Sequence, residues 1–316
     1  MRRRTLWYQQ VLILMMVVGM GSTCNSESKT ETPNATPTSF TKIERDNYQL
    51  YRPIGKIAAV LVLFGGYPET AADIQREFPI LESALQRGVA VVFSKVNQIL
   101  WLETAERRAL AVPLQTMFRE HQLPRERVVI GGFSSGGNLS LLLSNYLHGS
   151  VEFNLKPVGV FAVDAPVDLV ALYAAAERRL RQSQSEIALR ESRFIVDLLG
   201  TTLGNPADHP KVYERQSVYV EGSSALPNVE HLQQTDIRLY TEPDSLWWSE
   251  HRNVSYDQTN AFHLESFSRR LRAEDFERVT FIATQKRGYR ANGDRHPHSW
   301  SIVDEEELVE WILGLR

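Results

Sequence analysis

The chain has 316 residues, of which 43% are hydrophobic and 23% charged, and its formal net charge is −3. These proportions are ordinary for a soluble globular protein and exclude a disordered chain, a collagen-like repeat and a multi-pass membrane protein. Without a surplus of basic residues to neutralise phosphates, we expect no nucleic-acid partner. The single cysteine, Cys24, excludes an intrachain disulfide and a cysteine-rich metal site.

The N-terminal segment has the pattern of a targeting signal. Three arginines, Arg2–Arg4, precede the apolar run Val11–Met20, which is too short to span a bilayer as a helix. Small residues and Cys24 follow, so the segment resembles a bacterial lipoprotein signal. The resemblance implies a signal peptide at residues 1–23 and a lipid attached to Cys24. Secretion after cleavage behind Gly21 and an uncleaved anchor are the alternatives.

Residues 24–40 are rich in Ser, Thr, Pro and Asn and contain almost nothing apolar. Such a segment cannot bury enough surface to order itself, and we predict a flexible tether. The domain then begins at residue 41. This arrangement predicts a protein held on the membrane of the bacterial cell envelope by its N-terminal lipid, with a secreted or periplasmic protein as the alternative.

The body of the chain alternates between short apolar runs and segments of helical periodicity. Continuous apolar runs are typical of strands that are buried on both faces of a parallel sheet. The predicted strands are Ile57–Phe64, Val89–Phe93, Arg127–Gly131, Val158–Val163, Ile237–Tyr240 and Val279–Ala283. The predicted helices are Ala71–Arg87, Leu102–Gln122 with a break or kink near Pro113, Leu139–Leu147 and Val303–Leu313. The alternation predicts an α/β fold with a mainly parallel sheet and helices on both faces.

One stretch interrupts this rhythm. Between Val163 and Ile237 lies a long segment without a clear strand, and Leu169–Leu199 within it is helical in composition and highly charged. We predict that residues 165–235 form a helical insertion. Its position in the chain predicts a cap over the ends of the strands.

Ser134 is the predicted nucleophile. It occupies the centre of Gly132-Phe133-Ser134-Ser135-Gly136, a G-x-S-x-G motif that lies between a predicted strand and a predicted helix. This context is the one that the motif requires, because the tight turn projects the serine hydroxyl above the sheet. Ser135 is the competing serine, but the spacing of the glycines favours Ser134.

Through this motif and its context the chain resembles the α/β-hydrolase superfamily, in its serine esterase and lipase-like branch. The resemblance covers residues 42–316. It implies an α/β-hydrolase fold and a serine hydrolase that cleaves a carboxylic ester or a related acyl bond of a small molecule. It also implies that neither a cofactor nor a metal ion takes part. A serine peptidase of the same fold and a non-catalytic binding lipoprotein are the alternatives.

The family's oxyanion loop follows an early strand. Here Ile57–Phe64 is followed by Gly65-Gly66-Tyr67-Pro68-Glu69, which is similar to the family's H-G-x-P form. By this resemblance the oxyanion donors are the backbone N–H of Tyr67, or of Gly66, and that of Ser135.

The family order places an acid and then a histidine after the serine. Asp244 follows the strand Ile237–Tyr240 and is the predicted acid, with Glu242 as the alternate. Asp164 and Asp168 follow the preceding strand, where anchoring a turn is the favoured role and that of the acid is the less favoured one.

The predicted histidine is His298, because a small residue and an aromatic follow it before the last helix, and His296 is the alternate. The two histidines could instead bind a metal, but no third cluster of ligands accompanies them. Trp247 and Trp248 line an acyl pocket or, in the favoured interpretation, only pack.

Overall fold

The computed structural model describes residues 39–97, 99–183 and 185–316. The predicted signal peptide, Cys24 and nearly all of the predicted tether lie outside the described residues. In the described part of the chain, no helix combines the length and the apolar character needed to cross a membrane.

The described residues form an eight-stranded sheet with the strand order β1-β2-β4-β3-β5-β6-β7-β8. β2 runs antiparallel to its neighbours β1 and β4, and all other neighbouring pairs are parallel. The strands are β1 Phe40–Glu44, β2 Tyr48–Pro53, β3 Ala59–Phe64, β4 Val89–Ser94, β5 Val128–Phe133, β6 Gly159–Val163, β7 Asp236–Thr241 and β8 Val279–Ala283.

Strands β3 to β8 match the six predicted strands to within two residues at each end. β1 and β2 were not predicted from the sequence. β1 lies at the edge of the sheet and its side chains are mostly exposed, so it has no apolar run to reveal it. Because β1 begins at Phe40, ordered structure starts before residue 41, the predicted start of the domain.

Ten α-helices are found among the described residues: α1 Ala71–Glu77, α2 Leu81–Gln86, α3 Thr104–Glu120, α4 Ser135–Gly149, α5 Leu169–Gln182, α6 Glu186–Leu203, α7 Pro210–Gln216, α8 Ser245–Arg252, α9 Asn260–Ala273 and α10 Glu305–Gly314. The single helix predicted over Ala71–Arg87 is in fact two helices, α1 and α2. Pro79 lies between them, and its ring prevents the helix from continuing. Pro113 lies inside α3, which continues on both sides of it.

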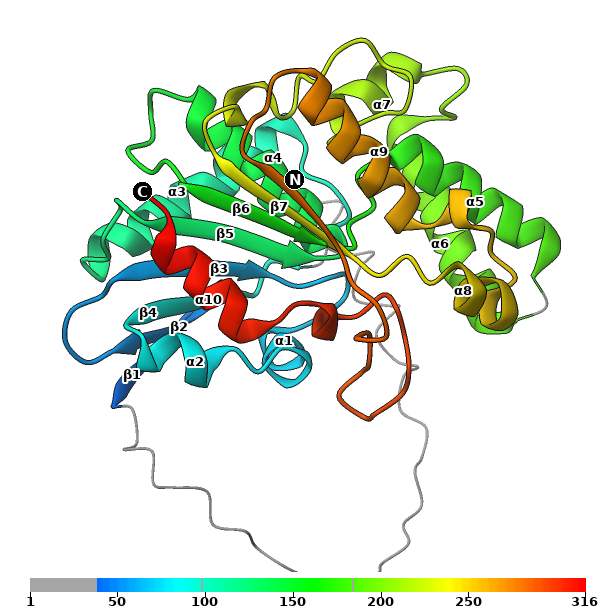
Figure 1. The fold of residues 1–316 in the computed structure, drawn as a ribbon. Coiled ribbons are helices and arrows are strands. Elements are labelled where there is room, and N and C mark those ends of the chain that lie inside the picture. Colours follow the sequence, from blue (N-terminus) through cyan, green and yellow to red (C-terminus); the bar gives the residue numbers. More distant parts are fainter. Residues whose placement is uncertain (1–38, 98, 184) are drawn as a thin grey trace, which may run out of the picture. The chain divides into compact units, whose positions relative to one another are not determined.

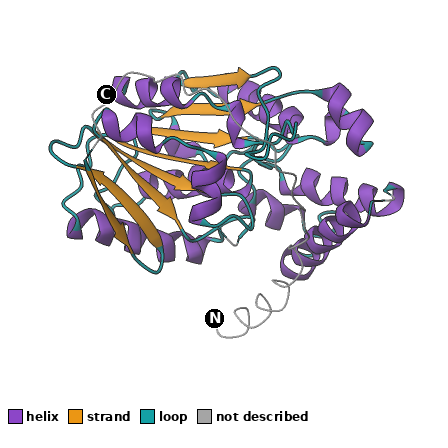
Figure 2. Ribbon diagram, turned by 90° about the horizontal axis from the view of Figure 1, so that it is seen from below, coloured by secondary structure: helices purple, strands orange, loops and turns teal. Residues whose placement is uncertain are grey.

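The sheet is packed between two layers of helices, as Figures 1 and 2 show. Alternate residues of β3 point to opposite faces. Val60 and Val62 belong to a core that includes residues of α3, α4 and α9, whereas Leu61 and Leu63 belong to a core with residues of α1, α2 and α10. All four side chains are essentially inaccessible to solvent, and each contributes about 1.5–3 kcal/mol to folding.

The segment between β6 and β7 contains α5, α6, α7 and the short 3₁₀ helix Glu230–Leu232. Figure 1 shows α5 and α6 beyond the carboxyl ends of the strands. The ring of Phe194 in α6 stacks on that of Tyr67, with 5.1 Å between the centroids. This contact places α6 beside the loop that follows β3.

Candidate active site

Ser134 lies on the sharp turn between β5 and α4. Its backbone φ of 53° and ψ of −126° are strained for a residue with a side chain. From Val128 to Asn145, Ser134 is the one residue that is not buried. The turn therefore brings a single hydroxyl out of an otherwise buried strand and helix.

The glycines on either side of Ser134 have no room for a side chain. A Cβ at Gly132 would lie 2.4 Å from the carbonyl carbon of Gly136, and a Cβ at Gly136 would lie 2.2 Å from the carbonyl oxygen of Phe64. Both contacts are with backbone, which cannot yield as a flexible side chain does. The close approach of β5, α4 and β3 thus requires the two glycines of the motif.

The ends of β5 and β6 bring Ser134 and Asp164 together. Phe133 pairs with Val163 across the two strands, and the Ser134 N–H donates to the Val163 carbonyl oxygen at 2.8 Å. Asp164 follows Val163 directly and has a positive φ of 45°. The first carboxylate after β6 therefore lies next to the nucleophile turn.

His298 contacts Asp164. The His298 Nδ1 and the Asp164 Oδ2 are 2.6 Å apart, and the Thr241 hydroxyl donates to the other carboxylate oxygen at 2.6 Å. Asp164 is only 4% exposed, so water does not compete for these bonds. When Nδ1 donates to the carboxylate, Nε2 of the neutral ring is left as the acceptor that a general base requires.

The His298 ring also packs on Phe133, the residue before Ser134. The two ring centroids are 4.4 Å apart. His298 is thus fixed from two sides, by the Asp164 carboxylate and by the Phe133 ring. The structure brings Ser134, His298 and Asp164 together at the carboxyl ends of β5 and β6.

The prediction that Asp244 is the acid that contacts His298 is wrong. The Asp244 Oδ1 accepts the N–H of Trp247 at 3.0 Å and so caps α8. Its Oδ2 pairs with Arg295 at 2.6 Å. Asp244 faces Arg295 because the guanidinium compensates its charge, whereas His298 has turned toward β6.

Asp168, the other candidate after β6, anchors a turn as predicted. Its Oδ1 accepts the N–H groups of Val170 and Ala171 at the start of α5, at 2.9 and 3.0 Å. Its Oδ2 accepts the N–H of Glu221 at 2.9 Å. The carboxylate is fully engaged as a helix cap.

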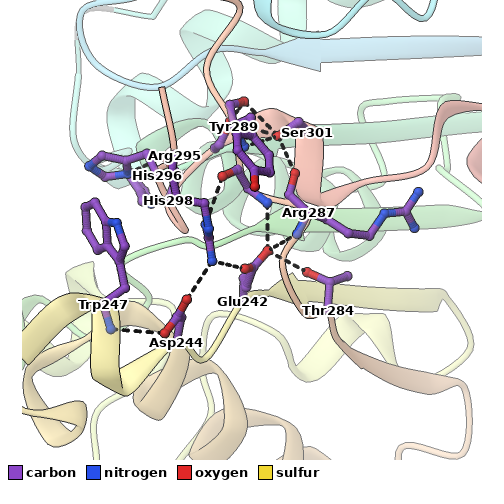
Figure 3. Close-up of polar contacts among 12 residues, drawn as sticks. Glu242, Asp244, Trp247, Thr284, Arg287, Tyr289, Arg295, His296, His298 and Ser301 are labelled. Atoms are coloured by element: carbon purple, nitrogen blue, oxygen red, sulfur yellow. Dashed lines mark hydrogen bonds and ion pairs between the residues drawn. The ribbon is translucent and has the colours of Figure 1, made fainter. Parts of the chain in front are cut away.

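Glu242, the alternate acid, holds the loop that carries the histidines. One carboxylate oxygen accepts the backbone N–H groups of Arg287 and Gly288 at 2.8 and 2.7 Å, and the other contacts the Arg295 guanidinium. Figure 3 shows these contacts together with that between Arg295 and Asp244. Glu242 is 2% exposed, and it acts on the shape of the loop rather than on His298.

His296 lies in an aromatic cluster. Its ring centroid lies 4.8 Å from that of Trp247 and 5.7 Å from that of Trp248. Burial, reinforced by electrostatic interactions with His298 and Arg290, lowers the pKa of His296 to about 3. His296 is therefore neutral at physiological pH, and the two tryptophans pack around it.

The predicted oxyanion donors are engaged by side chains of the protein itself. The Tyr67 N–H donates to the Ser135 hydroxyl at 2.9 Å, and the Gly66 N–H donates to the Glu69 carboxylate at 2.8 Å. The backbone N–H of Ser135 belongs to the first residue of α4, where no intrahelical acceptor exists. The motif gave no sign that Glu69 folds back onto its own loop.

Glu69 is a half-buried carboxylate beside this site. The indole N–H of Trp300 donates to the same Oε2 that accepts the Gly66 N–H. Burial raises the pKa of Glu69, while these two hydrogen bonds and the charges of Arg290 and His298 oppose the rise. The oxyanion loop thus has its own acid within the electrostatic reach of the histidine.

The described residues contain no cluster of three His, Cys, Asp or Glu side chains placed to hold a metal ion. They do place a serine, a histidine and an aspartate at the carboxyl ends of β5 and β6, with His298 in contact with Asp164. Side chains of these three types can together perform nucleophilic acyl transfer.

Comparison by sequence finds no matching protein family and no matching curated protein. Solved structures with a similar backbone are numerous. MPT51 of Mycobacterium tuberculosis has a TM-score of 0.56 at 11% identity, over 89% of this chain and 99% of that one. The fluorophosphonate-binding serine hydrolase FphF of Staphylococcus aureus has a TM-score of 0.52 at 12% identity, over 88% and 99%.

Carboxyl esterase 2 of Tuber melanosporum also has a TM-score of 0.52, at 15% identity, over 90% of this chain and 87% of that one. The strand order, the single antiparallel strand within the sheet and the similarity to these solved structures all indicate the same fold. The fold is that of the α/β-hydrolases. The predicted fold class is thereby confirmed.

Proposed function

We propose that this α/β-hydrolase-fold protein is a serine hydrolase that cleaves carboxylic esters of small molecules through Ser134, His298 and Asp164. The observation that carries the proposal is the strained, solvent-accessible Ser134 beside a histidine whose Nδ1 is held by a buried carboxylate. The esterase and serine hydrolase titles of structures with this fold support the same reaction class.

In the first half of the reaction, His298 Nε2 removes the proton of the Ser134 hydroxyl as its oxygen attacks the acyl carbon. Asp164 keeps Nδ1 protonated and stabilises the imidazolium that forms. The tetrahedral intermediate collapses when the bond to the leaving oxygen breaks, and His298 donates its proton to that oxygen. The alcohol departs and the acyl group stays on Ser134.

In the second half, water attacks the acyl carbon and gives its proton to His298 Nε2. Collapse of the second intermediate breaks the bond to Ser134, which takes the proton back. The products are a carboxylic acid and the free enzyme. Every proton transfer uses one ring nitrogen, so no further cofactor is needed.

The oxyanion of both intermediates needs backbone donors. The N–H of Ser135 is the donor at the start of α4, and those of Gly66 and Tyr67 are the donors of the loop after β3. Each such donor contributes roughly 10²–10³ in rate. In the free protein the loop donors are hydrogen-bonded to Glu69 and to the Ser135 hydroxyl, so the oxyanion must displace one of these acceptors.

A fluorophosphonate probe tests the proposal directly. The probe should form a covalent adduct on Ser134, and mass mapping of the labelled peptide distinguishes this residue from Ser135. The wild-type protein should hydrolyse 4-nitrophenyl butyrate, and Ser134→Ala should lose roughly 10⁶ in turnover, by analogy with serine proteases. A melting curve of the variant checks that it folds.

The result that contradicts the proposal is an unlabelled wild-type protein without activity toward esters of any chain length. Such a protein would be a binding protein with a hydrolase fold. A labelled protein that cleaves aminoacyl amides faster than esters would be a peptidase. A panel of 4-nitrophenyl esters beside aminoacyl 4-nitroanilides separates these cases.

We further propose that Cys24 is acylated and that the tether of residues 24–40 holds the domain at a bacterial envelope membrane. The support is the basic and apolar signal ahead of Cys24 and the polar composition after it. Mass spectrometry of the mature N-terminus should find a lipid-modified Cys24. An unmodified N-terminus at Ser22 would instead indicate plain secretion.

A further inference from the structure

Arg290 lies beside the nucleophile turn, on the loop that also carries His298. Its guanidinium carbon lies 5.8 Å from the centroid of the Phe133 ring, and the His298 ring packs on the same phenyl group. Phe133 directly precedes Ser134. The guanidinium and the imidazole are therefore both neighbours of one ring at the base of the nucleophile.

Arg290 has no ion-paired carboxylate within the described residues. The two acids whose charges act on it are engaged elsewhere. Glu69 accepts the Gly66 N–H, and Glu77 accepts the backbone N–H of Ala291 at 2.9 Å. Among the residues that the structure describes, the positive charge of Arg290 thus has no hydrogen-bonded anion to compensate it.

The other arginines of this loop differ in this respect. Arg287 pairs with Asp304 at 2.8 Å, and Arg295 pairs with Asp244 at 2.6 Å. Arg287 and Arg295 each hold part of the loop in place through these bonds. Arg290 performs no such role, although it is the arginine that lies beside Phe133.

Arg290 is partly withdrawn from water. Burial lowers the pKa of its guanidinium, and the charge of Arg252 on α8 acts in the same direction. The same two arginines help to lower the pKa of His296. The carboxylates of Glu77 and Glu69 act on Arg290 in the opposite direction, but neither is ion-paired with it. A partly desolvated guanidinium gains more from a directly bound anionic partner than an exposed one does.

We propose that Arg290 binds an anionic group of the substrate, so that the preferred substrates are esters that also carry a carboxylate. This inference rests on the proposed ester hydrolysis. The planar guanidinium can donate two hydrogen bonds to a carboxylate in a bidentate arrangement, and the bound anion supplies the ion pair that the described residues do not. Arg252 adds to the field but is placed on another element, α8.

The test compares esters that differ by one charge. 4-Nitrophenyl butyrate is the neutral ester, and mono-4-nitrophenyl glutarate carries a carboxylate on the acyl side. 4-Carboxyphenyl butyrate carries it on the leaving group instead, with phenyl butyrate as its neutral match. Arg290→Gln should reduce kcat/KM for one of the two anionic esters by roughly 10–100-fold, mainly through KM.

Hydrolysis of the neutral esters by Arg290→Gln should stay within about threefold of wild type, since the lost bond is made to the charged group alone. Arg290→Lys keeps the charge and should restore part of the preference. Arg287→Gln is the matched control, because its side chain pairs with Asp304 and should leave the preference unchanged. High salt should weaken the preference of the wild-type protein.

Two results would overturn the inference. In one, the wild-type protein prefers neither anionic ester over its neutral match. In the other, Arg290→Gln lowers the hydrolysis of charged and neutral esters alike. Calorimetric titration of Ser134→Ala with each intact anionic ester measures Kd without turnover. Adding Arg290→Gln to this variant should weaken the binding of one anionic ester by the factor that is expected for its kcat/KM. This readout tests Arg290 even if the proposed hydrolysis fails.

Discussion

Strands β6 and β7 are neighbours in the sheet, and each is followed by a buried carboxylate. Asp164 after β6 is 4% exposed, and Glu242 after β7 is 2% exposed. Asp164 meets a histidine and a threonine hydroxyl, whereas Glu242 meets two backbone N–H groups and an arginine. The two carboxylates are equally buried at equivalent strand ends, but they have different partners: Asp164 holds the His298 ring, and Glu242 holds the loop that carries it.

This difference shows that the position of an acidic residue in the chain does not decide which side chain its carboxylate contacts. The Arg295 guanidinium forms ion pairs with both Glu242 and Asp244, so neither carboxylate is available to a histidine. Asp164 has only neutral partners besides His298, and a carboxylate in that environment orients an imidazole well. Four substitutions examine this comparison.

The largest effect should follow Asp164→Asn. The asparagine keeps the size of the side chain but no longer stabilises the Nδ1–H tautomer of His298. If the proposed triad operates, kcat should fall roughly 10⁴-fold, as it does in serine proteases with a Ser-His-Asp triad. Steady-state kinetics with 4-nitrophenyl butyrate measures the loss. An inactive Asp244→Asn beside an active Asp164→Asn would reverse the assignment of the acid.

Glu242→Ala should mainly lower stability. It leaves the Arg295 charge with Asp244 alone and removes the acceptor of the Arg287 and Gly288 N–H groups. Breaking a buried ion pair in this way costs about 3–5 kcal/mol of unfolding free energy. Urea unfolding measures the cost, and a change below about 1 kcal/mol would mean that the loop is held by other contacts.

The histidines His296 and His298 also differ in their surroundings. His296 is kept neutral by burial, whereas His298 contacts a carboxylate. Its pKa falls from 6.5 to about 3 on folding, so the unfolded chain binds more protons between these values. Stability should be complete above about pH 6.5 and decline as the pH falls toward about 3. His296→Gln should flatten this decline in urea midpoints measured at about pH 7 and about pH 5. An unchanged slope would contradict the shift.

Asp244→Asn should have the smallest effect. Asparagine is as good an N-cap as aspartate, and the bond to Trp247 at the start of α8 can persist. The pair with Arg295 is partly exposed, so its loss should cost no more than about 1 kcal/mol. Activity should stay within about threefold of wild type. A large loss of activity at unchanged stability would show that Asp244 acts in the reaction.

The central strands and the sharp turn at Ser134 could be predicted because their signals are local. Continuous apolar runs mark β3 to β8, and the glycines around Ser134 are imposed by backbone atoms that a Cβ would strike. β1 carries no such signal, because an exposed edge strand has no buried face. Its prediction would have required knowledge of its pairing with β2.

The carboxylate that contacts His298 could not be chosen from the sequence, because this contact is set by residues distant in the chain. Asp164 reaches His298 through a positive φ and through the hydroxyl of Thr241, 77 residues away. The bond between Glu69 and Gly66 is local, yet the same carboxylate oxygen also accepts the indole N–H of Trp300, which lies 231 residues away in the chain. The direction in which such a side chain points is decided by tertiary packing and cannot be read from the sequence pattern.

The hydrogen bonds between Glu242 and the loop that carries His298 have a consequence for amide hydrogen exchange. The N–H groups of Arg287 and Gly288 lie outside any strand, yet they donate to a carboxylate that water does not reach. Their exchange should be slow and comparable with that of amides in the neighbouring strands, because it requires the buried pair to open. The loop that carries His298 is then expected to unfold together with the sheet and not before it.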